Sequence, residues 1–257
     1  MKCIRFPAAI PAVFFLAMGF TASAQAEVDV IAKAAIGSKT TELVILGRDF
    51  SPNFLTLDLS LTGAMGNFFV TFNNEFSIKD DIASYNDPND SSLDGLIFYS
   101  RQDTNITFGH SFEIATVFIG MRTGKTDAHY TANSSSFGTT SDGYYIGASK
   151  SYYYKDKGAL SGSIAIASLD GEVALSEPFV DTSAFVVGST PPATIKGSAL
   201  GLSLGIGWSG QIYGNTNYNI DLKLNQFDFE DDVVFGGLDL SYTENFSTLY
   251  LGITHFF

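Results

Sequence analysis

Large apolar residues alternate with small or polar residues through most of this chain of 257 residues, and this feature limits its fold most. The alternation is clearest where single glycines or serines separate five large side chains, Leu200, Leu202, Leu204, Ile206 and Trp208. A period of two places successive side chains on opposite faces of a β-strand. Helical periodicity is hard to find, so the sequence predicts an all-β protein.

Two architectures produce such strands. A soluble sandwich or barrel buries the apolar face, whereas a transmembrane barrel turns the apolar face to lipid and the polar face to its lumen. The polar faces here are rich in glycine, serine, alanine and asparagine. Only 16% of the residues are charged, against about 25% in a typical soluble domain. Aromatic residues gather near the ends of the expected strands, as in membrane barrels. These observations favour the transmembrane barrel.

The first 26 residues have the three-part pattern of a secretory signal peptide. Lys2 and Arg5 precede an apolar run of 13 residues at 8–20, and small residues then end with Ala24 and Ala26. The run is shorter than the roughly 20 residues that a helical membrane anchor needs. We therefore expect cleavage after Ala26. No second long apolar run follows, which excludes a helical membrane protein.

The last residues alternate in the same way, and the outward face of this strand is expected to carry Leu249, Leu251, Ile253, His255 and Phe257. Together with the signal peptide, this strand resembles the carboxy-terminal strand of bacterial outer-membrane β-barrel proteins. In that family the strand ends on an aromatic residue and is recognised by the barrel-assembly machinery. Here His255 replaces the usual third-from-last aromatic residue.

The resemblance covers roughly residues 40–257 and is to a porin-like architecture, with no subfamily identified. It implies a barrel in the bacterial outer membrane, surrounded by lipid and delivered by periplasmic chaperones to the assembly machinery. Such barrels have an even number of antiparallel strands, short periplasmic turns and longer outer loops.

Ten strands are easy to recognise, near 54–61, 68–77, 95–112, 115–126, 143–153, 158–169, 197–209, 216–228, 235–243 and 246–257. With ten strands and a periplasmic carboxy terminus, the long connections would lie on the periplasmic side, contrary to the usual pattern. Additional strands near 41–48 and 181–189 would move these connections outward. We therefore expect an up-and-down barrel of twelve strands over 41–257, with ten as the alternative. Residues 27–40 would then form a periplasmic or lumen-directed segment.

The residues that project inward from these strands give the lumen a mixed charge. The candidates are Asp58, Glu75, Arg101, Asp103, Arg122, Asp221, Lys223 and Asp239. Five acidic residues against three basic ones in a wet lumen would set a mild preference for cations. This favours a porin-like channel for passive diffusion of ions or small polar solutes. The alternative is that the charges pair and close a structural or surface-interaction barrel that acts through its outer loops.

Other classes of function have less support. His110 and the adjacent Ser111 point to opposite faces of one strand and cannot form a nucleophile–base pair, so we expect neither an enzyme nor a cofactor. Asp87, Asp90 and Asp94 offer oxygen ligands for a divalent cation, but they lack the spacing of an EF-hand, and a solvated acidic loop is the simpler interpretation. A net charge of −13 argues against nucleic acid as a partner.

Overall fold

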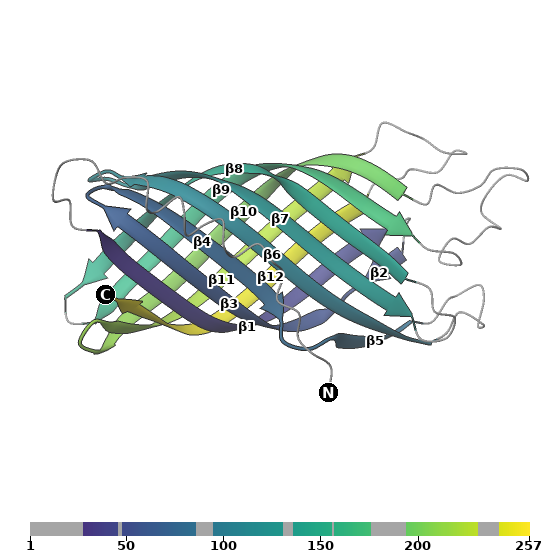
Figure 1. The fold of residues 1–257 in the computed structure, drawn as a ribbon, viewed down its shortest axis with the longest axis horizontal. Coiled ribbons are helices and arrows are strands. Elements are labelled where there is room, and N and C mark those ends of the chain that lie inside the picture. The colour runs from purple at the N-terminus through teal and green to yellow at the C-terminus, as the bar shows by residue number, and fades with distance from the viewer. Residues whose placement is uncertain are drawn as a thin grey trace, which may run out of the picture.

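The alternating segments pair side by side into one antiparallel sheet that closes on itself (Figure 1). The structure is a computed structural model and describes residues 28–45, 48–85, 95–130, 136–155, 157–175, 194–230 and 242–257. Within these ranges no helix is long and apolar enough to cross a membrane.

Ten long strands form the ring within the described ranges, and each pairs antiparallel with its neighbours. They are β1 (Asp29–Ile45), β3 (Asn53–Met65), β4 (Phe68–Ser77), β6 (Gly95–Ser111), β7 (Thr116–Tyr130), β8 (Ser136–Tyr154), β9 (Gly158–Leu175), β10 (Thr194–Tyr213), β11 (Thr216–Glu230) and β12 (Tyr242–Phe256). The short strands β2 (Arg48–Phe50) and β5 (Asp81–Tyr85) extend the pairing beyond the ends of β3 and β4. The all-β antiparallel barrel is confirmed.

The expected number of twelve strands around the barrel is wrong, and the number ten is confirmed. Nine of the ten expected strands are present and the tenth is β1, whereas the described end of the expected strand 235–243, Tyr242 and Thr243, belongs to β12. Residues 29–40 of the expected segment 27–40 and residues 41–45 of the expected strand 41–48 form the single strand β1, which pairs with β12 on one side and β3 on the other. The pairing has a physical cause, because an open sheet edge in lipid would leave backbone N–H and C=O groups without partners. The expected strand at 181–189 lies outside the described residues.

Including β1 in the ring determines at which end of the barrel the short and the long connections lie. With β1 in the ring, the short turns at 66–67, 112–115, 155–157 and 214–215 lie at the same end as the carboxy terminus (Figure 1). The longer separations between strands all fall at the opposite end. Gly66 and Gly214 have φ values of 60° and 52°, the positive values that tight two-residue hairpin turns require. Ten strands therefore give short periplasmic turns, and no further strand is needed.

The outward face of the barrel is apolar. On β10, Leu200, Leu202, Leu204 and Ile206 are between 41% and 76% exposed. Large exposed aliphatic side chains recur on the neighbouring strands, on Leu222 and Ile164 for example. Leaving such a side chain in water instead of an apolar medium costs about 1.5–3 kcal/mol. The belt therefore needs lipid around it, and this closed antiparallel barrel is an outer-membrane barrel.

Aromatic side chains mark the short-turn end of this belt. Several aromatic residues there are each more than half exposed, namely Phe68, Phe112, Tyr152, Tyr153, Tyr213 and Phe257. Lys150 lies at the same level, with its Nζ 5.2 Å from the centre of the Tyr152 ring, so its charge reaches the polar interface. The outward placement of Leu249, Leu251 and Ile253 on β12 agrees with the sequence. Their recognition by the assembly machinery stays a prediction.

The barrel has an apolar core inside its outer half, which the sequence analysis did not predict. Buried side chains near the strand ends opposite the short turns form this apolar plug, comprising Leu43, Phe50, Phe54, Ile97, Tyr99, Ala128, Phe137, Leu169, Val173, Ile195, Ala199, Phe227, Phe229, Tyr242 and Phe246. Phe229 and Tyr242 stack with ring centres 4.3 Å apart. An interior wider than that of an eight-stranded barrel needs such filling to be closed.

The role of β1 can be tested by refolding two fragments, 27–257 and 41–257, into detergent micelles. We expect 27–257 to migrate differently on a gel before and after boiling, because it forms the closed barrel. Fragment 41–257 lacks most of the strand that joins β3 to β12, so we expect the same migration with and without boiling. A heat-sensitive band from 41–257 would contradict the assignment of β1.

Candidate functional site

Seven of the eight charged residues predicted for the lumen lie within the described ranges, and all seven side chains point inward. They come from β3, β4, β6, β7 and β11, in the order Asp58, Glu75, Arg101, Asp103, Arg122, Asp221 and Lys223. Asp239 lies outside the described residues. So do the weak metal candidates Asp87, Asp90 and Asp94, and the cleavage-site residues Ala24 and Ala26.

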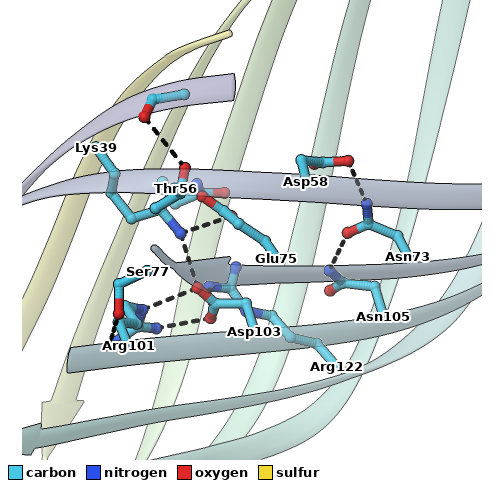
Figure 2. Close-up of polar contacts among 12 residues, drawn as sticks. Lys39, Thr56, Asp58, Asn73, Glu75, Ser77, Arg101, Asp103, Asn105 and Arg122 are labelled. Carbon is cyan, nitrogen blue, oxygen red and sulfur yellow. Dashed lines mark hydrogen bonds and ion pairs between the residues drawn. The ribbon is translucent and has the colours of Figure 1, made fainter. Parts of the chain in front are cut away.

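Asp103 is the centre of a buried charge layer (Figure 2). The Arg101 guanidinium donates from Nε to Asp103 Oδ2 at 2.9 Å and from Nη2 to Oδ1 at 2.8 Å. Lys39 Nζ donates to Oδ2 at 2.7 Å, and Arg122 Nη2 donates to Oδ1 at 3.0 Å. Arg101 Nη1 also donates to Thr126 Oγ1 at 2.7 Å. One carboxylate thus holds three cations from three different strands.

Two further acids complete this layer. Lys39 Nζ donates to Glu75 Oε2 at 2.7 Å, which links β1 to β4. Glu244 accepts from Thr139 Oγ1 at 2.8 Å and lies 3.6 Å from Arg101 Nη1 through the same oxygen, Oε1. The charge layer, defined as Lys39, Glu75, Arg101, Asp103, Arg122 and Glu244, therefore contains three cations and three carboxylates. Balance of this kind is what a buried set of charges requires.

The charge layer packs against the apolar plug. The Cζ atom of Arg101 lies 4.0 Å from the centre of the Phe246 ring, and that of Arg122 lies 4.8 Å from the Phe227 ring. The two rings are themselves 6.3 Å apart. Guanidinium groups over aromatic rings keep favourable contacts after they lose water. The plug and the charge layer consequently form one continuous filling of the outer half of the lumen.

Between the charge layer and the short turns, the lumen contains a polar cavity of about 490 Å³, called here the chamber. Small residues line it on the side of β8, β9 and β10, including Ser149, Ser163, Ser203 and Gly205. Solvent exposure rises toward the short-turn end. The side chains of Lys33 and Asp221, which pair at 2.6 Å, are 25% and 20% exposed, whereas those of Lys39 and Asp103 are 4% and 3% exposed. The chamber therefore communicates with the periplasmic side.

Polar side chains cross the chamber wall between β3, β4 and β6. Asn73 Nδ2 donates to Asp58 Oδ1 at 2.8 Å, and Asn105 Nδ2 donates to Asn73 Oδ1 at 3.1 Å (Figure 2). The buried Asp58 carboxylate has no ion pair with the described residues, and the hydrogen bond from Asn73 is its side-chain partner instead. The sequence placed Asp58 correctly but could not indicate its partner.

Several lumen residues were missed by the sequence analysis. Lys33 and Lys39 were missed because residues 27–40 were expected to form a periplasmic or lumen-directed segment instead of a strand of the ring. Glu244 was missed because a turn was expected between 243 and 246. A continuous period of two through Tyr242, Glu244, Phe246, Thr248 and Tyr250 was the signal that could have shown them on one inward face.

No family model matches this chain, and no curated protein matches it. Among solved structures it is similar to the translocator domain of the autotransporter NalP from Neisseria meningitidis, with 10% identity, 94% of this chain and 92% of that chain covered, and a TM-score of 0.48. The toluene transporter TodX of Pseudomonas putida has 7% identity, coverage of 91% and 90%, and a TM-score of 0.36. Neisserial surface protein A has 12% identity, coverage of 89% and 96%, and a TM-score of 0.33.

The charge layer can be tested with the substitution Asp103→Asn. It removes the carboxylate that three buried cations share, so we expect the free energy of unfolding to fall by about 3–5 kcal/mol. Equilibrium urea unfolding in lipid vesicles, followed by the fluorescence of Trp208 at the aromatic belt, measures the change.

A matched control is Asp127→Asn. Asp127 pairs with Lys125 at 2.8 Å, but the two side chains are 40% and 58% exposed, so the loss should stay below about 1 kcal/mol. Equal, small losses for the two variants would show that the Asp103 pairs contribute little to stability.

Proposed function

We propose that this outer-membrane barrel is closed to passive diffusion and acts through the surfaces that it presents on either side of the membrane. The observation that supports this proposal is the continuous filling of the outer half of the lumen by the plug and the charge layer. Leu43, Ile97 and Val173, which come from β1, β6 and β9, are each at most 1% exposed.

A hydrated ion has no wet path past such side chains. It would have to lose its water among apolar groups, which is very costly for an unpaired charge. Hydrophobic constrictions block ion flow for the same reason. Opening the lumen would also require separation of charges that are now buried and paired, such as Lys39 from Asp103. A closed ground state follows from both costs.

A non-catalytic role is part of the proposal. All three histidines point away from the chamber. His110 packs between the rings of Phe68 and Phe112, each 4.4 Å away, and His255 bonds through Nδ1 to Thr216 Oγ1 at 2.8 Å. His129 is on the outward face of β7. None is near the polar groups that line the chamber.

The second candidate is the porin-like channel for ions or small polar solutes, and the chamber is the observation that favours it. The expected cation preference loses its basis among the described residues, however. Four acids and four bases line the chamber, because β1 adds two lysines. They are Asp58, Glu75, Asp103 and Asp221 against Lys33, Lys39, Arg122 and Lys223.

Planar-bilayer recording separates the two candidates. We expect no steady single-channel steps from protein whose heat-modifiable migration confirms folding, because the plug blocks the lumen. In a closed barrel the substitution Asp221→Lys should leave the bilayer without conductance steps. In a channel it would shift the reversal potential in the direction that reports greater anion permeability. Regular conductance steps from the unaltered protein would overturn the closed-barrel proposal.

A further inference from the structure

Lys223 stands apart from the other cations that line the chamber. Lys33, Lys39 and Arg122 each form an ion pair with a carboxylate between 2.6 and 3.0 Å away. Lys223 has no ion pair or hydrogen bond with the described residues, and its Nζ lies 5.0 Å from the centre of the Tyr250 ring. Its ammonium group therefore retains three donors and a charge in the chamber.

Strand register places Lys223 at the end of a row of small polar residues. Lys223 of β11 is directly opposite Gly205 of β10, Gly205 is opposite Ser163 of β9, and Ser163 is opposite Ser149 of β8. Adjacent strands are about 4.8 Å apart, so the row extends about 14 Å across the chamber wall. The Ser163 hydroxyl lies over the inward side of Gly205, on the strand next to the one that carries Lys223.

The residues beside this row add further recognition groups. Ser203 donates to Asn225 Oδ1 at 2.5 Å, which leaves the Nδ2 group of Asn225 as a donor next to Lys223 on β11. The ring of Phe118 lies over Gly147, which precedes Ser149 on the inward face of β8. A hydroxyl row with an ammonium at one end and an aromatic ring at the other has the features of a specific polar ligand site.

We infer that the chamber binds a small organic anion that carries several hydroxyl groups, such as a sugar phosphate, from the periplasmic side. The anionic group pairs with Lys223 Nζ, the hydroxyl groups bond to Ser163 and Ser149, and the C–H face of the ring packs on Phe118. A cavity of about 490 Å³ is in the range of small-molecule sites, about 300–1,000 Å³. The site uses the half of the lumen that the closed-barrel proposal leaves without a role.

The test is isothermal titration calorimetry of the full folded barrel in detergent with glucose 6-phosphate, glucose and inorganic phosphate. We expect saturable binding of glucose 6-phosphate and weaker binding of each of the other two probes. Lys223→Gln should weaken glucose 6-phosphate binding about tenfold, because a charged hydrogen bond is lost. Ser163→Ala should weaken it about fivefold while leaving inorganic phosphate unchanged.

The matched control is Lys196→Gln. The Lys196 side chain is 74% exposed on the outward face of β10, so this substitution should leave glucose 6-phosphate binding unchanged. Heat-modifiable migration of each variant excludes misfolding as the cause of lost binding. No saturable binding of glucose 6-phosphate, equal binding by Lys223→Gln, or equally tight binding of inorganic phosphate would overturn the inference. Conductance steps alongside intact binding would overturn the closed barrel and leave this site standing.

Discussion

Pairing of the backbone around the full ring is the constraint on which the rest of this structure depends. In lipid an unpaired strand edge has no water to bond to, so the sheet must close, and β1 closes it against β12 over fifteen residue pairs. Closure brings Lys33 and Lys39 into the lumen. Without Lys39 the buried Glu75 carboxylate would lose its ion pair and Asp103 one of its three cations, and without Lys33 Asp221 would lose its ion pair. The closure that the backbone requires therefore also supplies much of the charge balance of the interior.

The interior then divides at the charge layer. Arg101 and Arg122 face aromatic rings on one side and carboxylates on the other, so the layer is compatible both with the dry plug and with the wet chamber. Neither the apolar plug alone nor the wet chamber alone would stabilise the charges of this layer. An apolar medium would leave the charges without bonds, and open water would screen the pairs and reduce their contribution. Asp103 accepts hydrogen bonds from side chains of three strands, so this boundary also links β1, β6 and β7 across the lumen.

Alternation alone was sufficient to predict the outward belt and the inward direction of seven charged residues, because side-chain direction in a strand depends only on parity. It failed for β1, whose outward residues include Ala32, Ala34 and Ser38 and so give little contrast with the inward face. It also failed for the plug, since Phe227 and Phe229 are as apolar as the lipid-facing Leu222 and Leu224. Partners such as Lys39 and Asp103 depend on the register of strands far apart in sequence, which no local pattern contains.

The shape of the chamber follows from where the chain places aromatic side chains opposite inward glycines. The ring of Tyr250 lies 2.7 Å from where a Cβ atom of Gly37 would be, and the ring of Phe227 covers Gly201. Such pairs fill the lumen by setting a large side chain over an empty position on the next strand. Over Gly205 the hydroxyl of Ser163 takes the place of a ring, so less of the lumen is filled there. Since the number of strands fixes the width of the barrel, this local exchange of ring for hydroxyl, rather than any change in the sheet, determines where the lumen is open.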